Sequence, residues 1–174
     1  FHASDSESGR RLLRETGLEG APLPVIIMRD GQALVAPSNA ELSDSLGETN
    51  AEDRACDLVV IGAGPAGLAA AVYAASEGLD TVVVEREAIG GQASTTSLIR
   101  NYLGFPRGIS GTELAQRAYQ QAWLFGAKYV FAREVSQLRA SGDRRTVALS
   151  DGRALSTRAV LIASGATYRR LDVP

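Results

Sequence analysis

DLVVIGAGPAGLAAAVYAASEGLDTVVVE, residues 57–85, decides the fold of this chain. Residues 58–61 are an apolar run of strand length, and they lead directly into a G-x-G-x-x-G turn at residues 62–67. Residues 68–77 are rich in alanine and contain neither glycine nor proline, which predicts a helix. Residues 81–84 are a second, β-branched strand. The stretch therefore predicts a βαβ unit.

Each glycine of the turn has its own physical role in such a unit. Gly62 lets the chain turn sharply, Gly64 lets the backbone approach a pyrophosphate, and Gly67 lets the helix pack closely on the strand. The unpaired N–H groups and the dipole of the helix's first turn then face two phosphates. Glu85 ends the second strand, where a carboxylate can accept hydrogen bonds from ribose hydroxyls. We predict a dinucleotide site here, the alternative being a merely tight glycine-rich turn.

Composition limits the class of protein. The chain has 174 residues, of which 45% are hydrophobic, enough for one domain or a little more with a real core. A net charge of −2 without a basic block gives no reason to expect a nucleic acid or membrane surface as partner. No apolar run approaches the length of a membrane span, and the N-terminus lacks the apolar stretch of a signal peptide. The single cysteine, Cys56, excludes an internal disulfide framework, and we expect it to be a small buried side chain.

Residues 1–47 have a separate pattern. It consists of a polar helix, a strand, a hairpin turn at Asp30-Gly31, a returning strand and a closing helix, over residues 8–16, 23–28, 33–35 and 40–46. This order resembles the second half of the thioredoxin and glutaredoxin fold, in which a cis proline precedes the strand, and Pro24 stands at that place. The alternative is an unrelated α+β segment. Residues 48–55 are polar and are predicted to be a linker.

Residues 90–104, GGQASTTSLIRNYLG, are too polar to form a core element. They offer backbone N–H groups and hydroxyls along an extended path, which suits a long polar ligand. Asn101 could present an amide that donates and accepts at the edge of a heterocycle. The glycine turn alone would also permit NAD as the primary ligand. This long polar stretch favours FAD, which is the longer molecule. A polar surface loop is the alternative.

The rest of the chain continues the α/β pattern. We predict a helix, a strand, a three-stranded antiparallel meander and a central parallel strand, over residues 114–125, 128–132, 135–140, 146–149, 154–155 and 159–163. The last strand ends in Ser164-Gly165-Ala166, residues small enough to let a ligand approach closely.

Residues 57–174 resemble the N-terminal FAD-binding part of the flavoproteins with two dinucleotide-binding domains, most closely the thioredoxin reductases of the low-molecular-weight bacterial type. The motifs that carry this resemblance occur in the family's order: GAGPAG at 62–67, Glu85, GGQASTTSLIRNYLGFP at 90–106, GTEL at 111–114 and ASGATYRRLDVP at 163–174. Ser164 replaces the usual threonine and keeps a hydroxyl. The implied fold class is α/β: residues 56–174 form an incomplete Rossmann-like FAD-binding domain, a parallel sheet plus an antiparallel β-meander, behind a half thioredoxin-like α/β segment.

The resemblance also implies a role for individual residues. Those at the FAD pyrophosphate would be Gly62, Gly64, Pro65, Ala66 and Gly67, with Ala163 and Gly165 beside it. Glu85 would bind the adenosine ribose, and Val135 would meet the adenine through its backbone. Gly91 and Gln92 would line the cofactor path, and Asn101 would hydrogen-bond near the flavin ring. We single out no catalytic residue and no metal ligand.

The function implied by the resemblance is an FAD-dependent oxidoreductase that passes electrons from NADPH to a disulfide acceptor, such as a thioredoxin-like protein. The NADPH site and a redox C-x-x-C would follow in a downstream domain. We expect this chain to be a fragment of a larger cytoplasmic protein that forms a homodimer at full length. Three alternatives stay open: a ferredoxin–NADP reductase-like enzyme, an alkyl hydroperoxide reductase flavoprotein-like enzyme, and a non-catalytic sensor that binds FAD or NAD.

Overall fold

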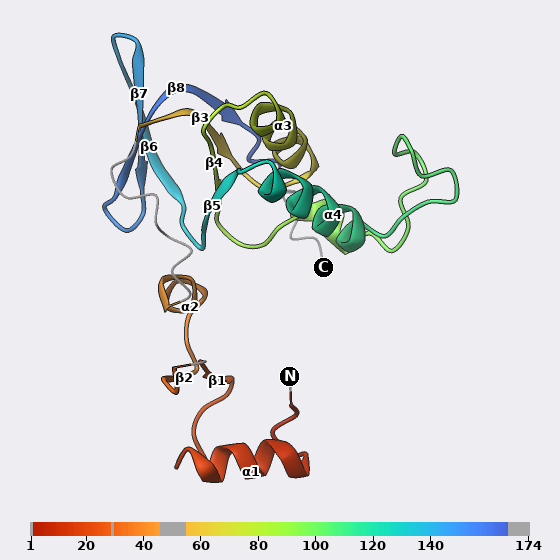
Figure 1. Ribbon diagram of the computed structural model, residues 1–174, viewed down its shortest axis with the longest axis vertical. Coiled ribbons are helices and arrows are strands. Elements are labelled where there is room, and N and C mark those ends of the chain that lie inside the picture. The colour runs from red at the N-terminus through yellow and green to blue at the C-terminus, as the bar shows by residue number, and fades with distance from the viewer. Residues whose placement is uncertain (1, 29, 46–54, 167–174) are drawn as a thin grey trace, which may run out of the picture. The chain divides into compact units, whose positions relative to one another are not determined.

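The computed structural model describes residues 2–28, 30–45 and 55–166 (Figure 1). The chain divides into two compact units, Phe1–Leu46 and Gly47–Pro174. Of the predicted linker, residues 48–55, only Ala55 lies within the described residues, and there it begins a strand. The assignment of domains to these ranges therefore stays a prediction.

The first unit is built from short elements that local signals define. Its elements are α1 (Glu7–Glu15), β1 (Val25–Ile27), β2 (Ala33–Val35) and α2 (Asn39–Ser45). Strands β1 and β2 pair antiparallel, and the Gln32 N–H donates to Asp30 Oδ1 at 3.0 Å in the turn between them. The hairpin is therefore confirmed, and the Leu23-Pro24 peptide is cis, as the resemblance predicts.

The second unit contains one sheet in the order β5-β4-β3-β8-β7-β6. Its parallel part consists of β3 (Ala55–Ile61), β4 (Thr81–Glu85), β5 (Lys128–Phe131) and the second half of β8 (Ala154–Ile162). The first half of β8 pairs antiparallel with β7 (Arg144–Leu149), which pairs antiparallel with β6 (Val135–Ser141). The predicted combination of a parallel sheet and an antiparallel meander is therefore confirmed.

The division of β8 into two strands was wrong. The sequence suggested separate strands at 154–155 and 159–163 because Ser156, Thr157 and Arg158 interrupt the apolar pattern. In the structure Thr157 is fully buried, and its hydroxyl donates to the Ala159 carbonyl at 2.9 Å. Because this polar group has a partner inside the protein, the strand continues through it. One strand thus belongs to both parts of the sheet.

Both faces of the parallel strands are buried because their side chains alternate between the faces. On one face Val60 and Val83 pack in a cluster with Leu68 and Ala71 of α3 (Pro65–Ser76) and with residues of α4 (Gly111–Leu124). On the other face Val59, Val82 and Val84 pack in a cluster with Val147, Leu149 and Leu155 of the meander strands. Figure 1 shows α3 and α4 on the same side of the sheet. This packing fixes the positions of the strands' carboxyl ends, where the candidate site lies.

Cys56 is 4% exposed in β3, which confirms it as a small buried side chain. Burial raises the pKa of its thiol. None of the helices in the described ranges combines the length and the hydropathy that a bilayer crossing requires.

Candidate functional site

The turn from β3 to α3 leaves room for a side chain at one of its three glycines only. Gly62 has a φ of +102°, and a Cβ added there would lie 2.4 Å from the Ala163 carbonyl oxygen. A Cβ on Gly67 would lie 1.9 Å from the Gly62 carbonyl oxygen. A Cβ on Gly64, in contrast, would meet no described atom within 4 Å. Gly62 and Gly67 are thus required by packing, whereas the surface at Gly64 is open to a ligand.

Helix α3 begins at this open surface with unpaired donors. Gly64 is its N-cap and offers no side-chain cap, and Pro65 occupies the first turn. The Leu68 N–H donates to the Gly64 carbonyl at 2.9 Å, but the N–H groups of Ala66 and Gly67 have no hydrogen-bond partner among the described residues. Free donors at the positive end of a helix favour an anion.

The Glu85 carboxylate faces the glycine turn from the end of β4. Its Oε2 accepts from the Ala63 N–H at 2.6 Å, and its Oε1 accepts from the Glu87 N–H at 2.8 Å. A carboxylate has about four acceptor positions, so further positions remain for a ligand's hydroxyls. Glu85 therefore fixes the turn and keeps acceptor capacity beside it.

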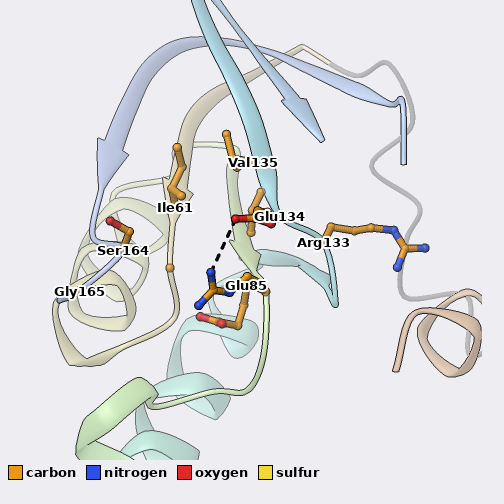
Figure 2. A pocket seen from close by; sticks show the side chains of 10 residues that line it. Ile61, Glu85, Arg133, Glu134, Val135, Ser164 and Gly165 are labelled. Atoms are coloured by element: carbon orange, nitrogen blue, oxygen red, sulfur yellow. Dashed lines mark ion pairs between the residues drawn. The ribbon is translucent and has the colours of Figure 1, made fainter. Parts of the chain in front are cut away.

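A cavity of about 340 Å³ lies at the carboxyl ends of the parallel strands (Figure 2). Its lining is drawn from the ends of several strands: Ile61, Gly62, Val84, Glu85, Arg86, Arg133, Glu134, Val135, Ser164 and Gly165. Ligand cavities in open α/β sheets form outside this edge, and about 300–1,000 Å³ is their ordinary size. The position and the size of the cavity both suit part of a nucleotide.

Four of the predicted site residues, Gly62, Glu85, Val135 and Gly165, line this cavity. Ala163 lies next to it, and its N–H donates to the Ile61 carbonyl at 2.8 Å. The predicted residues Gly64, Pro65, Ala66 and Gly67 lie at the adjoining start of α3. The structure thus gathers these sequence-distant residues at one edge of the sheet, although their individual ligand contacts stay predictions.

The predicted extended path at Gly91 and Gln92 was wrong, because these residues form a short 3₁₀ helix, η1 (Gly91–Thr95). Hydroxyl groups stabilise the tight winding, since Ser94 Oγ donates to the Gly91 carbonyl at 2.7 Å. The segment packs on the glycine turn: the Gly90 N–H donates to the Ala63 carbonyl at 2.7 Å. Gln92 Nε2 also donates to the Ala166 carbonyl. Gly91 and Gln92 therefore lie beside the site, in a different conformation from the one predicted.

Asn101 does not come together with the cavity. It is exposed in the stretch between Ile99 and Ile109, which are paired by an isolated β-bridge. Figure 1 shows this stretch as a green excursion beyond α4. The predicted role of Asn101 at a flavin ring stays a prediction.

The sequence reasoning missed three charged residues of the cavity, Arg86, Arg133 and Glu134. Arg86 stands directly after β4 and Glu134 directly before β6, but charged residues are common at such positions and gave no specific signal. Arg86 Nη2 donates to Glu87 Oε1 at 2.7 Å, and this hydrogen bond is the main cause that raises the pKa of Arg86.

Arg133 is 5% exposed, and its Nε donates to Asp151 Oδ2 at 2.5 Å. Burial opposes ionisation of Asp151, but hydrogen bonds from Arg153 and Arg133 hold the pKa of Asp151 well below its usual range. This arginine is therefore fixed by a carboxylate at the rim of the sheet.

Comparisons with known proteins agree with this geometry. The family model described as pyridine nucleotide-disulphide oxidoreductase matches residues 56–174. The thioredoxin reductase of Bacillus subtilis (strain 168) is 37% identical over 123 residues, which are 71% of this chain and 38% of that protein. A 34.2 kDa protein in the rubredoxin operon of Clostridium pasteurianum is 38% identical over 123 residues, covering 71% of this chain and 39% of that protein.

Solved structures give the same result. The thioredoxin reductase of Lactococcus lactis superposes with a TM-score of 0.64 at 34% identity, covering 68% of this chain and 38% of that one. The thioredoxin reductase of Streptococcus pyogenes MGAS5005 has a TM-score of 0.64 at 38% identity, covering 69% of this chain and 38% of that one. The chain spans 38% and 39% of the length of the two curated relatives described above. Because the family model covers more than half of its residues, the chain belongs to the pyridine nucleotide-disulphide oxidoreductase family.

Proposed function

We propose that this chain supplies the FAD-binding part of an NADPH-dependent oxidoreductase of the thioredoxin reductase type. The observation that carries the proposal is the arrangement around Gly64. An open backbone surface, two N–H groups without a partner among the described residues, and the Glu85 carboxylate meet within one strand-to-helix turn. Packing alone does not require glycine at position 64, because a Cβ there would meet no described atom within 4 Å.

The residues present fit the parts of a dinucleotide. The N–H groups of Ala66 and Gly67 can donate to a pyrophosphate at the positive end of α3. Glu85 retains acceptor positions for ribose hydroxyls. The cavity between Glu85 and Val135 has room for an adenosine.

A bound flavin supplies the electron-transfer chemistry, and the protein supplies binding, orientation and electrostatics. In this chain the start of α3 stabilises negative charge, and Glu85 holds the turn in shape by accepting from Ala63 N–H. The buried faces of the sheet keep both groups in place. We assign no proton donor or acceptor to the reaction.

The proposal extends to the partners of the whole protein. NADPH would be the electron donor, and a thioredoxin-like or other disulfide protein would be the acceptor. The similarity to the thioredoxin reductases of Bacillus subtilis and Lactococcus lactis supports both parts. Homodimer formation, a cytoplasmic location and a half thioredoxin-like domain at residues 1–47 belong to the same proposal.

The test uses the full-length protein that contains this chain. We expect the purified protein to carry a flavin absorption band that bleaches when NADPH is added without oxygen, and to reduce a protein disulfide. Gly64→Val should abolish the band because its side chain fills the open surface, whereas Asp143→Asn, in the β6–β7 turn, should keep it. A folded but colourless wild-type protein would refute FAD binding. A flavin that never bleaches would indicate a sensor instead.

A further inference from the structure

Two arginines line the cavity, and they differ in what holds them. Arg133 is 5% exposed, and its Nε donates to Asp151. In Figure 2 the Arg133 side chain extends away from Glu85. The side chain of Arg86 is 59% exposed and stands directly after Glu85, at the end of β4. Arg86 is thus the guanidinium that can reach a ligand in the cavity.

Two carboxylates hold the Arg86 guanidinium at the cavity. Its Nη2 lies 2.7 Å from Glu87 Oε1, and its Nη1 lies 3.6 Å from Glu134 Oε1. The second ion pair, dashed in Figure 2, joins the end of β4 to the connection before β6. It therefore links two walls of the same cavity.

This ion pair contributes little to the stability of the fold, because Arg86 and Glu134 have side chains 59% and 62% exposed and water screens their attraction. An ion pair that contributes little to folding can still hold a bound ligand in one position when it joins two walls of the cavity. A planar guanidinium stacks on aromatic rings, and adenine offers such a face. Glu134 lines the same cavity as Arg86 and lies 3.6 Å from its Nη1, so it can hold the guanidinium beside that cavity.

We propose that Arg86 and Glu134 form a clasp that covers the adenine end of the bound dinucleotide and slows its release. Arg86 is the positioning residue of the clasp, and Glu134 holds Arg86 in place. The inference rests on the proposed binding of FAD. It assigns to Arg86 a role separate from that of Glu85, because Glu85 faces the glycine turn and Arg86 faces Glu134.

The test measures the release rate of FAD from the full-length holoprotein, by the fluorescence that FAD regains in solution. Arg86→Ala should raise the rate constant about tenfold through loss of stacking, and Arg86→Lys should restore part of it. Glu134→Gln should raise the rate about threefold, because Glu87 still holds the guanidinium. Arg139→Ala, an exposed arginine of β6 outside the cavity, is the matched control and should change nothing.

Ionic strength separates a clasp from a merely structural arginine. Release should accelerate with added salt more steeply in the wild type than in Arg86→Ala, because salt screens the exposed ion pairs of Arg86 in addition to the attraction of the pyrophosphate for α3. Equal rates and equal salt dependence in the two proteins would overturn the clasp. If the wild type carries no flavin, the proposed function fails. AMP is then the probe for the clasp, judged by the same comparison of dissociation rates and by the same criterion.

Discussion

The two units of this chain differ in what they bury. Among the described residues of the first unit, the buried ones are Gly9 and Ser43, and apolar side chains such as Leu23 remain 55% exposed. The second unit has two clusters of buried apolar side chains, one on each face of its sheet. Caps and turn residues define the elements in both units. A core that can hold those elements together is present in the second.

This difference predicts unequal stability along the chain. A two-stranded hairpin is marginal in water without a hydrophobic face packed on something larger. A doubly covered parallel sheet has apolar burial on both sides. We therefore expect the first unit to open at a lower free energy than the second. Two substitution pairs test this expectation, and a third pair compares two positions within the second unit.

Truncation of a core side chain should give the largest contrast. Leu68 is 1% exposed in the cluster under α3, whereas Val35 is 40% exposed on β2. Leu68→Ala should lower the free energy of unfolding by about 2–5 kcal/mol, because it removes apolar contacts and leaves a cavity. Val35→Ala should cost less than about 1 kcal/mol, because little of that side chain is taken from water. Urea unfolding of both variants measures the difference, and equal losses would contradict the comparison.

A pair of glycines sharpens the comparison within the second unit. Gly67→Ala should destabilise by about 1–3 kcal/mol, because its Cβ would lie 1.9 Å from the Gly62 carbonyl oxygen. Gly64→Ala should leave the unfolding midpoint nearly unchanged, since a Cβ there meets no described atom within 4 Å. It should weaken FAD binding instead. Thermal unfolding and flavin content together test both statements; a stable Gly67→Ala protein with normal flavin would show that the close contact is dispensable.

The pH dependence of stability should differ least between the two units. Hydrogen bonds from Arg153 and Arg133 hold the pKa of Asp151 below its usual range, so the stabilisation is present above about pH 4 and is lost as the pH falls through the lowered pKa. Asp151→Asn should lower the unfolding free energy by about 1–3 kcal/mol at pH 7, a difference that shrinks in acid.

Glu41 in the first unit gives the matched case. The backbone N–H and the hydroxyl of Ser38 lower the pKa of its exposed carboxyl. Glu41→Gln should weaken the start of α2 with the same sign of pH dependence, but by less than the change at Asp151. Unfolding curves at pH 7 and pH 3 decide the order. A larger effect at Glu41 than at Asp151 would reverse the proposed ranking of the two units.

Much of the fold could be predicted from the sequence because local rules determine it. The glycine turn, the alanine-rich helix and the β-branched strands gave the βαβ unit, and the turn residues gave the meander. The continuity of β8 could not be predicted, because it depends on the burial of Thr157 by distant strands. The 3₁₀ conformation at Gly91 likewise depends on packing against the glycine turn.

The candidate site was predictable where function requires a particular residue type, and less so elsewhere. Gly62 and Glu85 were found because a close approach and a carboxylate at a strand end leave a pattern in the sequence. Arg86 and Glu134 left no such pattern, because exposed charges are common and only the sheet brings these two together. Asn101 was assigned from the chemistry of its amide and from the resemblance, and it is not among the residues that line the cavity.

Strand β8, which belongs to both parts of the sheet, determines when the sheet can be completed during biosynthesis. Strand β3 is paired residue by residue with β8, as at Ala55 with Ser156, roughly a hundred residues later in the chain. At about 5–20 residues per second, the ribosome needs about 5–20 s to make the second partner after the first. During that interval the glycine turn has emerged without the neighbouring strand that supports it. Nascent chains of this protein should therefore acquire affinity for a nucleotide only after residue 162 has left the ribosomal exit tunnel.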